Sequence, residues 1–177
     1  GQLLHAFCQQ QKNIQLYLPN LNQPPEQVVA DLSQLIESLE DVGLIGSSLG
    51  GFYATQLVAK YGVPAVLLNP AMRPWQLFDD LFGSAQIPYV VNAQWTLDAQ
   101  QLQQLQQMAV SAVKDADKIL VLLQQGDEIL DYREAQRYYS RGSKGSLLIT
   151  ETHGQHAMDN FADKIPMVLQ FLSDCIK

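Results

Sequence analysis

The sequence predicts an α/β fold in which a mostly parallel sheet carries helices on both faces. Short apolar runs alternate along the chain with longer segments in which apolar residues recur at helical spacing. One apolar run leads through a glycine-rich corner directly into a helical segment. With 177 residues, 47% of them hydrophobic, the chain can bury a substantial core. We therefore expect residues 1–177 to form a single domain.

In the first half of the chain, three predicted helices alternate with three predicted strands. Residues 3–8 have helical character, and residues 14–18 alternate as a strand does before Pro19. Residues 23–39 open with two prolines and then place apolar side chains on one helical face. The remaining elements are a strand over 42–45, a helix over 52–61 and a strand over 64–68. This alternation of helices with hydrophobic strands favours a parallel sheet that is covered on both faces.

The second half of the chain adds two predicted strands. Residues 73–91 are irregular, with proline, glycine and aromatic residues. The expected elements are a helix from Thr96 or Asp98 to residue 113, a strand over 118–123, a helix over 132–140, a strand over 146–151 and a closing helix. Region 73–113 lies between two sheet strands. It is interpreted either as a lid or insertion over the site or as a plain crossover connection.

Residues 46–51, Gly-Ser-Ser-Leu-Gly-Gly, stand between a predicted strand and a predicted helix. Gly-x-Ser-x-Gly in that context is typical of the nucleophile elbow of α/β-hydrolases. The strained turn brings the helix close to the strand, so we expect positions 46 and 50 to need residues without bulk and Gly51 to give the helix further room to pack. Ser48 is the predicted nucleophile, and the helix start places the backbone N–H of Leu49 where an oxyanion would form.

A serine nucleophile needs a base and an acid, which in this fold follow it in the order Ser, Asp or Glu, His. Ser48, Asp127 and His156 occur in that order, each just past the carboxyl end of a predicted strand, where ligands bind in open α/β sheets. The imidazole would remove the hydroxyl proton, and the carboxylate would fix its tautomer and stabilise its cation.

Other residues compete for the two supporting roles. Glu128 and Asp131 are alternatives for the acid, although Asp127 directly follows a glycine at the strand end. For the base, the alternatives are His153, immediately after the last strand, and His5, which lies in the first helix and is interpreted as structural.

Four motifs together resemble those of the YqiA-like esterases, which are small bacterial α/β-hydrolases. The motifs are Gly-Ser-Ser-Leu-Gly-Gly-Phe-Tyr-Ala at 46–54, Leu-Asn-Pro-Ala at 68–71 followed by Arg-Pro at 73–74, Gln-Gly-Asp-Glu-Ile-Leu-Asp-Tyr at 125–132 and Gly-Gln-His at 154–156. The resemblance implies that Ser48, Asp127 and His156 form the catalytic triad. It also implies a carboxylic-ester hydrolase whose substrates can include acyl-CoA thioesters. We expect no cofactor and no metal.

The sequence departs from the family at its start. The family opens with a strand that ends in a His-Gly-Phe loop, which would supply part of the oxyanion hole, and this sequence begins at Gly1 without it. We therefore expect an N-terminal strand, and with it the second oxyanion donor, to be missing from this chain. Two functions remain open: a serine esterase or thioesterase acting through an acyl-enzyme, and a catalytically weak scaffold that acts as a binding module.

Composition excludes several other classes of partner. The net charge of −7 argues against nucleic acid and anionic membranes, since phosphate binding needs clustered basic residues. No apolar run reaches the length of a membrane span, and no signal-peptide pattern occurs. Cys8 and Cys175 show no disulfide or metal-site spacing, which favours a reducing compartment. The sequence thus indicates a cytoplasmic monomer or homodimer that acts on a small acyl ester or thioester.

Overall fold

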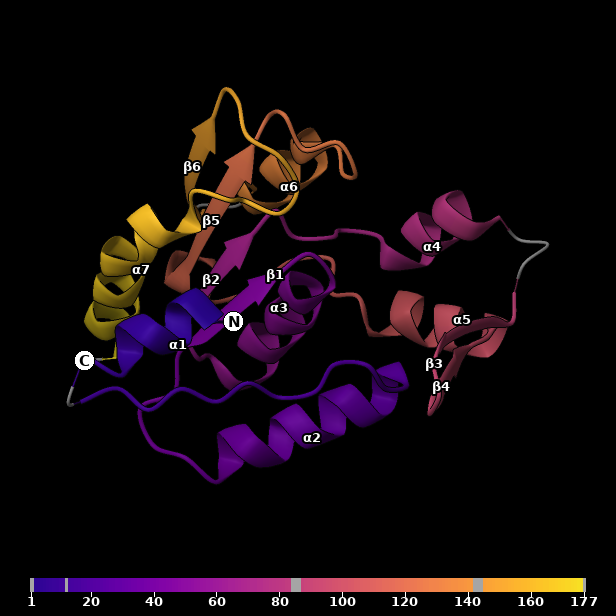
Figure 1. Cartoon of the computed structure of the whole chain (residues 1–177), viewed down its shortest axis with the longest axis horizontal. Coiled ribbons are helices and arrows are strands. Elements are labelled where there is room, and N and C mark those ends of the chain that lie inside the picture. The colour runs from indigo at the N-terminus through magenta and orange to yellow at the C-terminus, as the bar shows by residue number, and fades with distance from the viewer. Residues whose placement is uncertain (1, 12, 84–86, 142–144, 177) are drawn as a thin grey trace.

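Four parallel strands form the central sheet of the computed structural model, which describes residues 2–11, 13–83, 87–141 and 145–176 (Figure 1). The strands are β1 (Leu44–Ser47), β2 (Ala65–Leu68), β5 (Ile119–Gln124) and β6 (Leu147–Glu151), and they lie in the order β1-β2-β5-β6. Each pair is parallel and in continuous register. β2 and β5 are buried along their whole length, as expected for strands covered on both faces.

Helices cover both faces of this sheet, as the sequence predicts (Figure 1). On one face, α3 (Leu49–Tyr61) and α6 (Tyr132–Tyr139) share a core with alternate residues of β2 and β5. On the other face, α7 (Phe161–Ile176) packs on the remaining residues of these strands. The first helix, α1 (Gln2–Cys8), lies against α7 and closes a smaller apolar cluster. The helix α2 (Pro25–Glu37) packs on α3.

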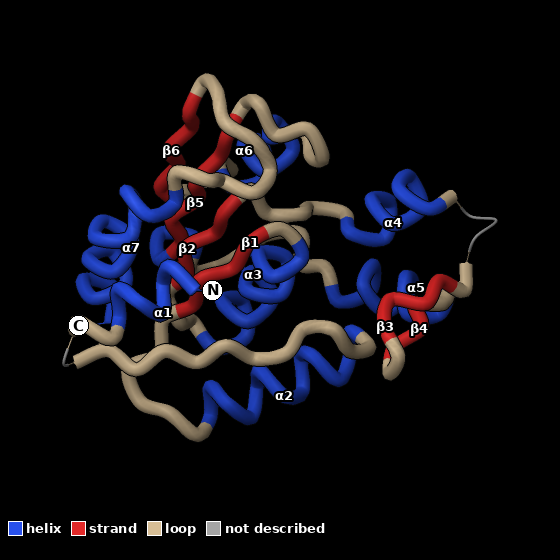
Figure 2. The backbone as a smooth tube through the Cα atoms, viewed as in Figure 1, coloured by secondary structure: helices blue, strands red, loops and turns tan. Residues whose placement is uncertain are grey.

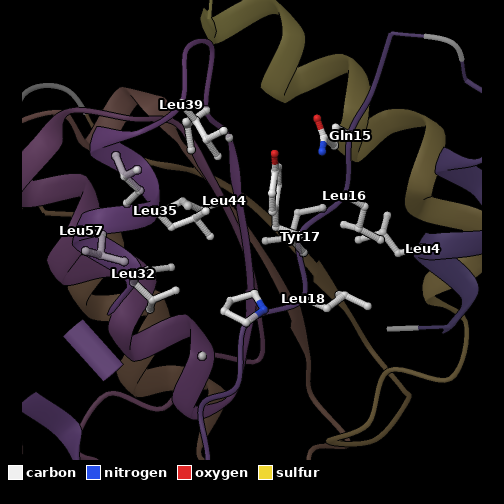
Figure 3. Close-up of a pocket in the computed structure, with 18 of the residues that line it drawn as sticks. Leu4, Gln15, Leu16, Tyr17, Leu18, Leu32, Leu35, Leu39, Leu44 and Leu57 are labelled. Atoms are coloured by element: carbon white, nitrogen blue, oxygen red, sulfur yellow. The ribbon is translucent and has the colours of Figure 1, made fainter. Parts of the chain in front are cut away.

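The predicted strand over residues 14–18 is wrong. The segment is an extended loop that belongs to no sheet (Figure 2). The side chains of Ile14, Tyr17 and Leu18 are exposed. A strand forms only by pairing with a neighbouring edge. The nearest edge belongs to β1, but a cavity of about 610 Å³ lies between the two. Figure 3 shows this cavity, with leucines of α2 and α3 on one side and Leu4 and Leu16 on the other.

Region 73–113 is more regular than the sequence suggests. It contains the helix α4 (Pro74–Phe82), an antiparallel hairpin of β3 (Tyr89–Asn92) and β4 (Trp95–Leu97), and the helix α5 (Ala99–Met108). Asp98 caps α5 by accepting the backbone N–H of Gln101 at 2.8 Å, and the helix ends five residues before the predicted end at 113. The hairpin and α5 bury a cluster of apolar side chains against α2 and α3.

No helix in the described part of the chain combines the length and the apolar character needed to cross a membrane.

Candidate active site

Ser48, Asp127 and His156 meet beyond the carboxyl ends of the parallel strands. Ser48 follows β1, Asp127 lies three residues after β5, and His156 lies in the loop between β6 and α7. The His156 Nε2 lies 3.0 Å from Ser48 Oγ. On the other side of the ring, Nδ1 lies 2.9 Å from Asp127 Oδ2 and 3.0 Å from Oδ1. The imidazole therefore bridges the hydroxyl and the carboxylate.

The backbone of Ser48 has the strained geometry of a nucleophile elbow. Its φ of 51° and ψ of −120° lie outside the regions that residues with a Cβ normally adopt. The surrounding chain maintains this conformation, because the Ser48 N–H donates to Leu68 and its carbonyl accepts the N–H groups of Gly51, Phe52 and Ala71. The turn presents the hydroxyl at the N-terminus of α3.

Close packing around the elbow requires glycine at position 46 but not at position 50. A Cβ on Gly46 would lie 2.4 Å from the Gly50 carbonyl oxygen, and one on Gly51 would lie 2.7 Å from Pro70 Cβ. A Cβ on Gly50 would meet only Leu21 Cδ1, at 3.4 Å, which is an ordinary contact. The expectation that position 50 must lack bulk is therefore wrong, since the space that a side chain would need is occupied at Gly46 and at Gly51 but not at Gly50.

We expect Gly46→Ala to destabilise the fold and Gly50→Ala to be tolerated. The first variant forces a methyl group against backbone atoms, a kind of overpacking that costs about 1–3 kcal/mol. The second replaces a glycine by the best helix former at a position with room for it. Urea denaturation of the two variants gives the free energy of unfolding. Equal loss of stability in both variants would contradict this account of the elbow.

Asp127 is placed to stay ionised. Its side chain is 1% exposed, and Oδ1 accepts the backbone N–H groups of Ile129 and Leu130, each at 2.9 Å. Burial acts to raise the pKa of Asp127, but the hydrogen bonds from His156, Leu130 and Ile129 together outweigh it and hold the pKa below its ordinary value. A buried carboxylate with three donors can stabilise a neighbouring cation without taking its proton.

The environment of His156 favours its protonated form. The hydrogen bond to Asp127 raises the pKa of the imidazole, partial burial acts in the opposite direction, and the charges of Asp127 and Glu128 add to the rise. The net pKa lies above the ordinary histidine value. An imidazole in this setting accepts a proton from Ser48 more readily than one in water.

The competing acids make different contacts. Glu128 Oε2 accepts the backbone N–H of His156 at 2.9 Å, and this bond lowers the pKa of Glu128. Asp131 caps α6 by accepting the N–H of Arg133 at 3.0 Å. Neither carboxylate is bonded to the imidazole of His156.

The other two histidines lie outside this cluster. His153 is exposed in the loop after β6, and His5 is exposed on α1. Only His156, among the three, has a ring nitrogen near Ser48.

Leu49 is the first residue of α3. The first N–H groups of a helix have no intrahelical acceptor, so this donor is free to bind an oxygen held at Ser48. The described residues include no group of three or more His, Cys, Asp or Glu side chains that could hold a metal ion.

Two further side chains contact the loop that carries His156. The position of Asn69 after a predicted strand is consistent with contact to the site or with a capping or packing role, whereas the sequence suggests no role for Gln124. Asn69, directly after β2, donates to the carbonyls of Gln155 and His156 at 3.2 and 3.1 Å. Gln124, the last residue of β5, accepts the N–H of Gln155 at 2.9 Å. Both side chains are almost completely buried. A polar amide at the end of an otherwise apolar strand is the signal that could have identified Gln124.

The cavity along β1 extends as far as the residues of the nucleophile elbow. Its lining includes Gly46, Ser47 and Gly50, but none of the three residues that meet at the strand ends. Its lining also includes leucines of α2, of α3 and of the extended loop, as Figure 3 shows. The cavity therefore belongs to the free edge of the sheet, and we do not assign it as the place where an ester bond would lie.

Solved structures share this architecture at low sequence identity. Mouse alpha/beta hydrolase domain-containing protein 10 aligns with a TM-score of 0.69 and 14% identity, over 98% of this chain and 82% of the mouse chain. Est1E from Butyrivibrio proteoclasticus aligns with a TM-score of 0.58 and 18% identity, over 85% of this chain and 68% of that one. The esterase domain of a Rhodothermus marinus protein aligns with a TM-score of 0.56 and 16% identity, over 88% and 68%.

These similarities show an α/β-hydrolase fold. The model of one sequence family, described as the uncharacterised protein family UPF0227, matches residues 1–173, almost the whole chain. The chain therefore belongs to the UPF0227 family, the family of YqiA-like proteins.

Proposed function

We propose that this protein is a serine hydrolase that cleaves carboxylic esters or acyl thioesters through an acyl-enzyme intermediate. The observation that carries the proposal is the position of the His156 imidazole, which lies within hydrogen-bond distance of both Ser48 Oγ and the Asp127 carboxylate. Nucleophile, base and acid are thereby connected in the arrangement that activates a serine hydroxyl.

In the acylation step, Ser48 Oγ attacks the acyl carbon while His156 Nε2 takes the hydroxyl proton. The negative charge that develops on the acyl oxygen is stabilised by the N–H of Leu49 at the start of α3. Asp127 accepts the hydrogen bond from the Nδ1–H of His156 and stabilises the imidazolium. When the tetrahedral intermediate collapses, His156 gives its proton to the leaving alcohol or thiol, and Ser48 is left acylated.

Deacylation repeats the same chemistry with water. His156 takes a proton from a water molecule, whose oxygen attacks the acyl carbon. The second tetrahedral intermediate then collapses, the acid product leaves, and the proton returns to Ser48. The two steps consume only the substrate and one water molecule, and the three side chains return to their initial protonation states.

A fluorophosphonate probe tests the proposal directly. We expect it to label Ser48 covalently, with phosphorus bonded to Oγ and fluoride released, because the probe reacts with serines activated in this way. Intact mass and peptide mapping identify the adduct, and Ser48→Ala serves as the unlabelled control. Ser47→Ala is a matched variant one residue away and should keep the label. Hydrolysis of short-chain nitrophenyl esters without any adduct on Ser48 would contradict the assigned mechanism.

We also expect a single acid limb in the pH dependence of kcat/KM. His156 acts as a base only when neutral, so activity falls as it protonates. Because the pKa of His156 is raised, the midpoint of this loss should lie above ~6.5, the ordinary histidine value. Asp127, whose pKa is lowered, stays ionised through this range. A midpoint clearly below the ordinary histidine value would contradict the described contact between the two residues.

A further inference from the structure

The loop that carries His156 is fixed by side chains rather than by regular secondary structure. Between β6 and α7 the chain forms no helix or strand, yet all four backbone polar groups of Gln155 and His156 have side-chain partners. The N–H of Gln155 donates to Gln124 Oε1, and the N–H of His156 donates to Glu128 Oε2, each at 2.9 Å. Both carbonyls accept from Asn69 Nδ2. Loops on a protein surface usually leave such groups to water.

Asn69 occupies the position that connects the other parts of the site. It directly follows β2, which lies between the strand that precedes Ser48 and the strand that precedes Asp127. Its N–H donates to Leu122 at 3.0 Å, and its Oδ1 accepts the N–H of Gln124 at 2.9 Å. Its φ of 40° lies in the left-handed region, which asparagine tolerates better than most residues. The residue is 2% exposed, so the hydrogen bonds of its side chain do not compete with bulk water.

Gln124 supports the same loop from the next strand. Its Nε2 donates to Glu151 Oε2 at 2.7 Å and to Asn160 Oδ1 at 2.8 Å, so the amide group is held at both ends. Gly154 packs directly against it, with a φ of 92°, and a Cβ on Gly154 would lie 2.2 Å from Gln124 Cδ. The glycine in the Gly-Gln-His motif therefore makes room for the glutamine that anchors the loop.

We propose that Asn69 and Gln124 are positioning residues that hold His156 at the distance from Ser48 that proton transfer requires. This inference rests on the proposed serine hydrolase function. Neither residue touches the reacting atoms, and each acts through the backbone of the loop. A displacement of a catalytic group by about 1 Å can cost on the order of 10²-fold in rate, so hydrogen bonds at this loop affect the chemistry directly.

Asn69→Gly removes the anchor without straining the backbone, because glycine accepts a positive φ. We expect kcat for a nitrophenyl ester to fall by about 10²-fold while KM changes by no more than about threefold, since the interaction lost acts on the transition state. Asn69→Asp is the second variant. It keeps an acceptor for the Gln124 N–H and nearly the same volume, but its ionised carboxylate has no donor for the two loop carbonyls. We expect a similar loss of kcat.

Asn92 provides a matched control. Its Oδ1 also accepts a backbone N–H, from Gln94 at 2.8 Å, and its Nδ2 also donates to a carbonyl, that of Asn22 at 3.3 Å. It lies in the β3–β4 hairpin, away from the His156 loop. We expect Asn92→Asp to keep the wild-type kcat. Circular dichroism establishes that each variant is folded at the assay temperature.

The acid limb of the pH profile separates positioning from simple stability. The charged groups that act on His156 are Asp127 and Glu128, and Asn69→Gly removes neither. A loosened loop weakens the Asp127 hydrogen bond, so the acid limb of folded Asn69→Gly should move to lower pH than in the wild type. A variant with only reduced stability would keep the wild-type limb.

Each outcome bears on one of the two proposals. If folded Asn69→Gly and Asn69→Asp both keep the wild-type kcat and acid limb, the positioning role is wrong while the serine hydrolase proposal stands. If Asn69→Gly does not fold, Asn69→Asp decides the question in the same assay. Absence of both ester turnover and Ser48 labelling in the wild type contradicts the proposed function itself.

Discussion

His156→Ala is expected to reduce ester turnover by roughly 10⁴-fold or more, the loss typical of a triad member that acts as part of a unit. The imidazole connects Ser48 Oγ with the Asp127 carboxylate, and alanine leaves the hydroxyl without this base. The measurement is kcat/KM for a short-chain nitrophenyl ester, together with the rate of fluorophosphonate labelling. Both should fall together because both depend on the activated hydroxyl.

His153→Ala is the matched control for this substitution. It lies in the same loop, three residues earlier, and its side chain is exposed without a contact to Ser48 or Asp127 among the described residues. We expect its activity to stay close to that of the wild type. The opposite pattern, an inactive His153→Ala and an active His156→Ala, would contradict the assignment of the base but not that of the nucleophile.

Asp127→Asn is the second substitution with a very large expected effect, about 10⁴-fold in kcat. The asparagine can still accept the N–H groups of Ile129 and Leu130, so the turn after β5 should persist. Its amide group can donate to His156 Nδ1, which places the ring proton on Nε2, the nitrogen that must accept the Ser48 proton. The imidazole would then occupy the right place in the wrong tautomer.

Asp131→Asn controls for the loss of a carboxylate in the same turn. Asp131 caps α6 through a single backbone N–H, and asparagine is an equally good cap, so stability and activity should both be retained. Activity measured on folded protein at a pH above the acid limb compares the two variants. Equal losses in both would mean that the negative charge of the turn, rather than the Asp127–His156 contact, supports the reaction.

The sequence was sufficient for the regular part of the fold because the signals there are local. Apolar runs identified all four strands of the central sheet, and helical spacing identified the helices that cover it. It was insufficient where pairing decides the structure. Residues 14–18 have the alternation of a strand, but strand formation needs a free edge within hydrogen-bond distance, and a cavity separates them from β1.

The structure of region 73–113 also depends on contacts with distant parts of the chain. Its short elements become regular mainly through the apolar cluster that they bury on α2 and α3, and contacts across the chain are not visible in local spacing. At the elbow, the glycine pattern was recognised, but only the packing of α3 against Pro70 shows that Gly51 needs to be glycine while Gly50 does not.

For the candidate site, the sequence alone was enough to predict the residue types, their order along the chain and their position at the carboxyl ends of strands. It left the two loop histidines and three carboxylates open, because residues close together in a loop can point in different directions and local sequence does not show which. In the folded chain, His156 faces Ser48 and Asp127 faces His156. The tertiary structure also shows Asn69 and Gln124, from two other strands, bonded to the backbone of that loop. A hydrogen bond between residues so far apart in the sequence forms only when the donor and acceptor lie within a few tenths of an ångström of their preferred distance. Only the packing of the whole chain sets that distance.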